Sequence, residues 1–203
     1  MANQNTLGGL NAIQTNGESL FRGSLTRFYI PASDTNAYYI GTPVVRSSAV
    51  AMQGVQGVTL ATGNAVTGSI QGFVGATDAG SNVTPTLRGL PVGPVYRPAS
   101  TSQDWYVLVS TDPSVTYSVQ VSNTDVLSET VIGKSATLVN VGAGSALQGS
   151  YAALNANSVS TGTGTVIITA LDPYAVNNDP TQPYAKYLVR LNDSTEVNGV
   201  AGI

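Results

Sequence analysis

Residues 23–45 read GSLTRFYIPASDTNAYYIGTPVV and gather four aromatic side chains around one turn. Residues 25–30 favour a short strand, because Phe, Tyr and Ile are enriched in strands. Pro31 ends this run, and the Ser, Asp and Asn residues that follow are typical of a turn. A second apolar run begins at Tyr38. The stretch predicts a hairpin with aromatic residues on both arms.

The composition indicates a folded domain with a weakly charged surface. Only 9% of the 203 residues are charged, compared with about a quarter in typical domains, and the net charge is -3. The apolar share of 42% argues against disorder, which combines low hydrophobicity with high net charge. We expect one domain, with much of its surface in contact with other protein.

The residue types that are missing exclude several functions. Without cysteine there is no disulfide or thiolate metal site, and without histidine there is no His-based triad or His zinc site. Eight Lys and Arg residues form no cluster that neutralises a run of phosphates. Residues 1–18 have neither the basic region nor the continuous apolar region of a signal peptide, so we expect none, and no apolar run approaches the roughly 18 residues that span a bilayer. We expect no cofactor, no nucleic acid and no membrane partner.

The clearest periodic pattern lies at residues 115–121. Val115, Tyr117, Val119 and Val121 alternate with polar residues, which predicts a strand with one buried and one solvent-facing side. Residues 105–109 are almost wholly apolar and predict a strand covered on both sides. Because Thr-Asp-Pro-Ser between them favours a turn, we expect the two strands to form a second hairpin.

Weaker patterns complete an all-β chain. Leu147, Tyr151 and Leu154 have the spacing of one short helix. Further strands are expected at 55–61, 66–74, 131–141 (a pair around Gly133), 166–171 and 187–191, with loops at 76–91 and 172–185. The predicted fold is a single β-barrel or two-sheet β-sandwich over residues 23–192. It has long loops, an extended N-terminal arm (1–22) and a flexible C-terminal tail (193–203).

No stretch predicts catalysis. Gly133-Lys134-Ser135 matches the end of a phosphate-binding P-loop, but the loop's first glycine is missing and a strand follows in place of a helix. Asp112, Asp172 and Asp179 each precede a proline, as turn-initiating residues do. Asp172 and Asp179 with the neighbouring Asn residues lack the spacing of a calcium loop. The sequence therefore predicts no enzyme and no small-molecule substrate.

The aromatic side chains have two interpretations. Tyr29, Tyr38, Tyr39, Tyr96 and Trp105 either pack in the core or form a platform for a carbohydrate or protein partner.

Five segments, in order and spacing, resemble the capsid decoration or cement proteins of tailed bacteriophages. They are residues 23–45, PVYRPAS at 94–100, WYVLVSTDPSVTYSVQV at 105–121, IGKSATLV at 132–139 and YAKYLVRLN at 184–192. Relatives of this kind often carry a histidine after the final Leu-Asn pair, whereas this chain has Asp193 and Ser194. The resemblance implies a β-rich homo-oligomer, commonly a trimer, that binds the outside of the mature head. There it reinforces junctions between capsomers of the major capsid protein.

The same resemblance implies a virion location, after synthesis in the host bacterial cytoplasm. The expected partner-contact residues are Phe21, Arg22, Arg27, Tyr29, Tyr38, Tyr39 and Arg97, with packing inside the domain as the alternative for each. A second hypothesis is a receptor-binding or adhesion module of the phage tail or fibre. A glycan depolymerase is the third.

Overall fold

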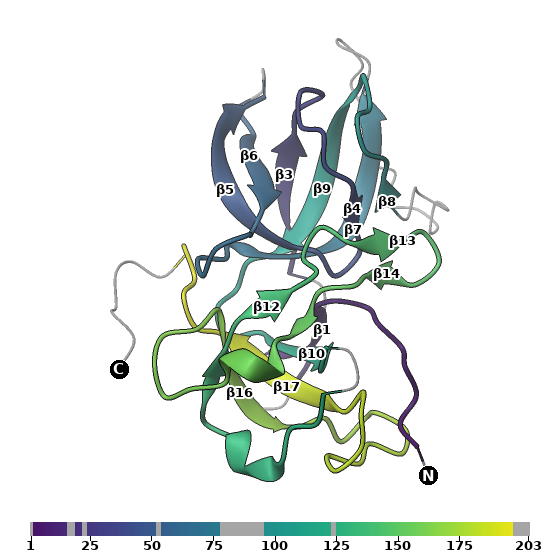
Figure 1. Cartoon of the computed structure of the whole chain (residues 1–203). Coiled ribbons are helices and arrows are strands. Elements are labelled where there is room, and N and C mark those ends of the chain that lie inside the picture. Colours follow the sequence, from purple (N-terminus) through teal and green to yellow (C-terminus); the bar gives the residue numbers. More distant parts are fainter. Residues whose placement is uncertain are drawn as a thin grey trace.

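The computed structural model describes residues 2–15, 19–21, 24–51, 54–77, 96–122 and 125–196. These residues form strands and two short 3₁₀ helices, with no α-helix among them, so the predicted all-β fold is confirmed. Figure 1 shows a ring of strands above a separate sheet.

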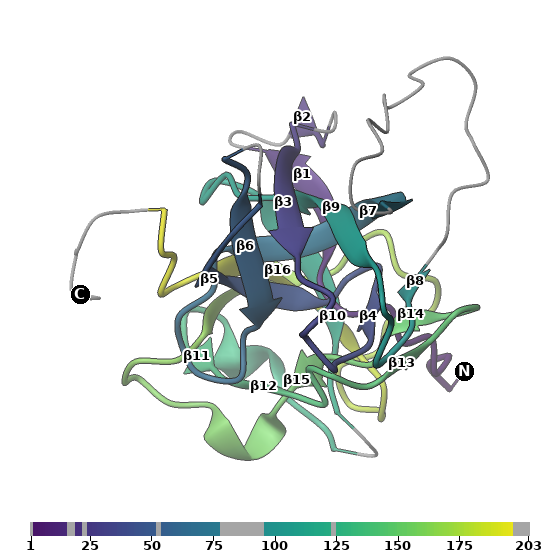
Figure 2. The same cartoon turned by 90° about the horizontal axis from the view of Figure 1, so that it is seen from above.

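Five strands close into the ring, in the order β3-β6-β5-β7-β9. They are β3 (Thr26–Ile30), β5 (Pro43–Val50), β6 (Gln56–Leu60), β7 (Gly68–Thr77) and β9 (Asp104–Ser110). Neighbours are antiparallel except β3 and β6, which pair in parallel at Tyr29 and Gly57 alone. Viewed from above, the five strands surround a common interior (Figure 2).

Alternate residues of the ring strands fill this interior. Phe28 and Ile30 of β3 lie opposite Val107 and Trp105 of β9. All four side chains are buried in one apolar cluster, which also holds Val44, Val58, Ile70, Val109 and Tyr38. The period-two alternation of strands thus places one set of apolar residues inside.

The second unit is a six-stranded antiparallel sheet in the order β11-β16-β17-β10-β1-β2. Its strands are β1 (Asn11–Thr15), β2 (Ser19–Leu20), β10 (Thr116–Gln120), β11 (Ser135–Ala136), β16 (Val166–Leu171) and β17 (Lys186–Leu191). Tyr117, Val119, Tyr187 and Val189 lie at its centre and are at most 1% exposed. Leu10, just before β1, belongs to the same core, so the N-terminal segment contributes to the sheet.

Three two-stranded ribbons and two 3₁₀ helices complete the chain. The ribbons are β4 (Tyr38–Tyr39) with β8 (Tyr96–Arg97), β12 (Leu138–Val139) with β15 (Ala153–Leu154), and β13 (Gly144–Ser145) with β14 (Gly149–Ser150). The 3₁₀ helices are η1 (Glu129–Val131) and η2 (Ala156–Ser158).

The predicted hairpin within residues 23–45 is wrong. β3 and β4 both form, but β3 pairs with β9 and β6, whereas β4 pairs with β8. The inward-facing side chains of β3 need the apolar partners that β9 supplies. The segment between β3 and β4 is instead a loop held by Arg97, which comes from a distant part of the chain.

The second predicted hairpin is wrong for a related reason. Its strands form as β9 and β10, but β9 lies in the ring and β10 in the six-stranded sheet. The turn at 111–114 therefore leads from one unit into the other. Here Asp112 accepts hydrogen bonds from the backbone N–H groups of Ser114 and Val115.

The solvent-facing side predicted for β10 is also covered. Ser118 and Gln120 are buried, and their polar groups have partners in the segments that cover them. Ser118 donates to Asp172 at 2.5 Å, and Gln120 bonds to Asn5 and Thr6. A polar alternation identified the strand correctly but did not reveal that polar partners cover its second face.

The predicted helix at Leu147–Leu154 is wrong, because this segment forms β14 and β15 with a turn before them. Gly149 has φ = 83°, a left-handed conformation that an α-helix does not contain. The predicted strand pair around Gly133 is wrong as well: β11 pairs with β16, and β12 with β15.

The remaining strand predictions are confirmed by β6, β7, β16 and β17, and the 172–185 segment contains no strand. The predicted loop at 76–91 begins with the last two residues of β7, and its residues from 78 onward lie outside the described part of the chain.

Candidate partner-binding surface

Arg97 and Tyr38 form a buried network at one end of the ring. Both side chains have no exposed area. Arg97 donates to the backbone carbonyls of Pro31, Asp34 and Asn36 at 2.6–3.1 Å, and Tyr38 donates to the Asp34 carboxylate at 2.6 Å. Burial lowers the pKa of Arg97 and raises that of Tyr38. Any effect of these two residues on a partner is therefore indirect, through the loop that they hold.

Arg27 and Tyr29 lie on the outer side of the ring, half-buried. The Arg27 guanidinium lies 3.8 Å from the centre of the Tyr106 ring. The centroids of the Tyr29 and Tyr106 rings are 5.9 Å apart. Burial, followed by a hydrogen bond with Asp104, raises the pKa of Tyr29 to about 12. The arrangement is a cation–π cluster on the ring surface, of the kind that aromatic and arginine contacts form at protein interfaces.

Tyr39 forms a second aromatic site on the ribbon β4–β8. Its ring stacks on Tyr96, with centroids 5.8 Å apart and planes 10° from parallel. Gly144 of β13 lies so close that a Cβ there would overlap the Tyr39 ring. The β13–β14 ribbon therefore packs against this stack. Tyr39 and Tyr96 remain half-buried.

Phe21 is separate from these residues in the fold. It follows β2, packs against the core of the six-stranded sheet, and donates its N–H to Ile13 at 2.7 Å. Arg22 lies outside the described residues. The structure thus brings Tyr38, Tyr39 and Arg97 together, places Arg27 and Tyr29 side by side on β3, and leaves Phe21 in the other unit.

Exposed apolar side chains were not identified from the sequence. Leu147, in the turn between β13 and β14, is 97% exposed, and Tyr174 and Val176 project from the 172–185 loop. Val50, Val126 and Ile132 are the other large apolar side chains that are exposed among the described residues. The sequence around Leu147 does not reveal that its side chain is exposed. Its exposure follows from the pairing of β13 with β14, which places Leu147 in the turn between them.

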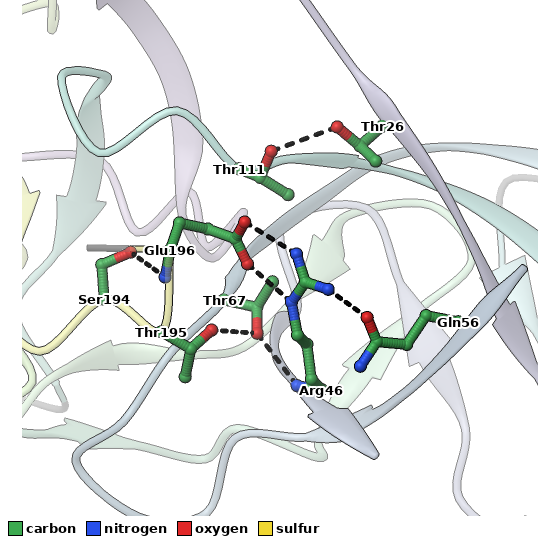
Figure 3. A network of polar contacts seen from close by, with 8 residues as sticks. All are labelled: Thr26, Arg46, Gln56, Thr67, Thr111, Ser194, Thr195 and Glu196. Carbon is green, nitrogen blue, oxygen red and sulfur yellow. Dashed lines mark hydrogen bonds and ion pairs between the residues drawn. The ribbon is translucent and has the colours of Figure 1, made fainter. Parts of the chain in front are cut away.

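The end of the described chain fastens the sheet to the ring, as Figure 3 shows. Arg46 of β5 donates to both carboxylate oxygens of Glu196 at 2.7 Å and also bonds to Gln56. The hydroxyl groups of Thr67 and Thr195 are 2.6 Å apart, and Val66 forms a β-bridge with Ser194. This clamp is polar and half-exposed, and it ties residues 194–196 to β5 and to residues 66–67, which directly precede β7.

The acidic residues act locally as turn acceptors. Asp34, Asp112, Asp172 and Asp179 each accept a hydrogen bond from the backbone N–H two residues ahead, at 2.8–2.9 Å. The turn role predicted for the three Asp-Pro pairs is confirmed. Within the described residues no three of the His, Cys, Asp and Glu side chains come together as metal ligands. No helix among them is long and apolar enough to cross a membrane.

Two hollows flank the N-terminal segment where it lies over the six-stranded sheet. The larger, of about 240 Å³, is bordered by the 172–185 loop and Lys186, and the smaller, of about 150 Å³, by Asn5, Gln120 and Ser122. Tyr184 lines both.

Comparison with known proteins identified no relative. No family model, no curated protein and no solved structure matches the chain.

Proposed function

We propose that the protein is a cement protein of a tailed-bacteriophage head. It binds the outer surface of the mature capsid as a homo-oligomer, which its resemblance implies is a trimer, and stabilises junctions between capsomers of the major capsid protein. The proposal rests on one observation: the five segments that resemble this family pair with one another or join the same sheet in the fold. Residues 23–45 pair with 94–100 through β4–β8 and with 105–121 through β3–β9.

The pairing continues into the second unit. Residues 105–121 pair with 184–192 through β10–β17, while 132–139 reaches the same sheet through β11. Segments that are far apart in the sequence therefore assemble into one connected framework. This favours a resemblance that extends over the whole fold.

The surface supports binding to another protein. Leu147, Tyr174 and Val176 are exposed on segments outside the two main units, and Arg27, Tyr29 and Tyr39 offer half-buried aromatic and cationic groups. Aromatic and Arg side chains are enriched at interfaces, and charged residues are depleted at their centres. Several such subunits bound to neighbouring capsomers gain avidity of about 10² to 10⁴ over a single contact.

The decisive experiment is sedimentation of the purified protein with expanded heads and with unexpanded proheads of the phage. Saturable binding to expanded heads, at a copy number comparable with that of the major capsid protein, is expected. Equal binding to both particles, or to neither, contradicts a cement protein. A handful of copies per purified virion favours the tail or fibre module instead.

Substitution of one exposed and one half-buried residue locates the contact. Leu147→Asp and Tyr39→Ser are expected to weaken head binding, with circular dichroism unchanged for Leu147→Asp because this side chain contacts almost nothing in the fold. Ile132→Asp, an exposed position near η1, is the matched control.

A further inference from the structure

The hollow between the N-terminal segment and the 172–185 loop has the features of a small-ligand site. Its volume is about 240 Å³, below the roughly 300–1,000 Å³ of sites for drug-sized molecules. Lys186 supplies a cation, Gln4 supplies a side-chain amide, and Tyr174 and Val176 supply apolar surface.

Hydrogen bonds hold both walls of this hollow in place. The Asn3 amide donates to the carbonyls of Asp179 and Pro183 at 2.8 and 2.9 Å, and its oxygen accepts from the N–H of Asp179. The Asn178 side chain brackets the backbone of Lys186, accepting from its N–H at 2.8 Å and donating to its carbonyl at 2.7 Å. The hollow is therefore a preformed feature of the fold.

Lys186 is the unusual group in this hollow. Its side chain is half-buried, and burial lowers its pKa while the charge of Asp172 raises it. Among the described residues its ammonium has neither a hydrogen bond nor an ion pair within 4 Å. Asp172, the nearby carboxylate, is already bonded to the Ser118 hydroxyl and to the N–H of Tyr174.

Backbone conformation adds a second observation. Tyr184 lines the hollow with φ = 66°, a left-handed conformation that is uncommon for a bulky residue and costs on the order of 1 kcal/mol or more. Such strain is concentrated at ligand sites, where the surrounding structure fixes it.

We propose that this hollow binds a carboxylate carried on a short aliphatic stem. The carboxylate accepts a charge-assisted hydrogen bond from Lys186 and an amide hydrogen bond from Gln4, while the stem lies against Tyr174 and Val176. A single cation suits a monoanion better than a phosphate dianion. The proposal does not rest on head binding. A free acid and an acidic side chain of a partner protein share this chemistry, and the test below distinguishes them.

The test is a titration of the uniformly ¹⁵N-labelled protein followed by amide chemical shifts, with butyrate as the probe and butyramide as its neutral counterpart. Saturable shifts around Asn178 and Lys186, with millimolar affinity and no response to butyramide, are expected. Lys134, the chain's other lysine, provides the matched control. Lys186→Gln is expected to weaken butyrate binding by about tenfold or more, and Lys134→Gln is expected to leave it unchanged.

Two further arms complete the design. Lys186→Arg retains the charge and is expected to retain binding, which separates loss of the cation from loss of the fold. N-acetyl-glutamate methylamide binding more tightly than butyrate identifies a protein carboxylate as the ligand, and equal affinity identifies a free acid. An equal response to butyrate and butyramide, shifts that survive in Lys186→Gln, or tighter binding of inorganic phosphate overturns the proposal.

Discussion

The ring and the six-stranded sheet are stabilised by different interactions. At the centre of the sheet, β10 and β17 pair without a bulge and both contribute apolar side chains. Tyr117 lies opposite Val189, and Val119 lies opposite Tyr187. The ring closes through a single residue pair between β3 and β6, and one of its ends is organised by the buried cation of Arg97. Burial of apolar area therefore dominates the sheet, whereas the ring also depends on the hydrogen bonds of a buried cation.

This contrast predicts that the two units respond differently to substitution. Trp105, the chain's one tryptophan, is buried in the ring, so its fluorescence reports on that unit. Far-UV circular dichroism reports on the strands of both. Comparison of the two signals in urea distinguishes loss of the ring from loss of the whole fold.

The largest effect is expected from Val119→Asp in the sheet. A carboxylate at this position, 1% exposed and surrounded by apolar side chains, has no partner, and the expected loss in the free energy of unfolding exceeds about 4 kcal/mol. Both signals should be lost together. Arg190→Asp, at an exposed position of β17, is the control and is expected to change stability by less than about 1 kcal/mol. If Val119→Asp unfolds at the wild-type urea midpoint, Val119 is not buried in the apolar core of the sheet.

Arg97→Met is expected to act on the ring first. It leaves three backbone carbonyls without their donor, at a cost of about 3 kcal/mol or more. The Trp105 signal should change at lower urea than the circular dichroism signal. Arg97→Lys restores the charge but not the three-way geometry and is expected to recover only part of the loss. Coincident transitions in Arg97→Met would show that ring and sheet unfold as one unit.

Gly41→Ala tests the joint between the two units. Gly41 has φ = 85°, and a Cβ here would overlap the carbonyl of Gly8 in the N-terminal segment. Gly54 has a similar φ of 76° with no atom within 4 Å of its Cβ position, so Gly54→Ala measures the backbone strain alone. We expect about 1 kcal/mol for Gly54→Ala and about 2–4 kcal/mol for Gly41→Ala in urea unfolding. Equal losses contradict close packing at Gly41.

The sequence predicted strands better than their partners. The apolar alternation at 115–121 identified β10 because period two is a local property of the chain. Pairing is not local: β9 and β10 are joined by only five residues but lie in different units, because each finds its apolar partners elsewhere. The same reason separates β3 from β4.

The candidate surface was predictable only in part. Arg27 and Tyr29 fall on the outer face because Phe28 and Ile30 fill the ring, an alternation that the sequence contains. The burial of Arg97 was not predictable, since it depends on three carbonyls more than 60 residues away. The Lys186 hollow likewise arises from Asn3 and the 172–185 loop, which meet only in the folded chain.

Alkaline pH is expected to weaken the contact that Tyr117 makes between the units. Its hydroxyl, buried beneath the sheet, donates to the carbonyl of Ser110 at the end of β9, and burial raises the pKa of Tyr117 to about 12 from its usual 10.0. The unfolded chain loses this proton first, so stability is intact below pH 10 and falls as the pH rises towards 12, by on the order of 2 kcal/mol. Tyr117→Phe should make this dependence shallower in urea unfolding at pH 9–12 without abolishing it, because burial also raises the pKa of Tyr29, Tyr38 and Tyr187. An unchanged slope contradicts the assignment.

The smallest effect is expected at the clamp between Arg46 and Glu196. The two side chains are 37% and 22% exposed, and an ion pair in such a position contributes less than about 1 kcal/mol, even with bidentate geometry. Glu196→Gln should therefore lower the urea midpoint slightly, and added salt should reduce the difference. A double-mutant cycle with Arg46→Gln isolates the pair from the contacts of Arg46 with Gln56 and with the Phe28 ring. A coupling energy above about 2 kcal/mol would show that the C-terminal segment holds the ring closed, and would make the ring's stability depend on its attachment to the sheet as well as on Arg97.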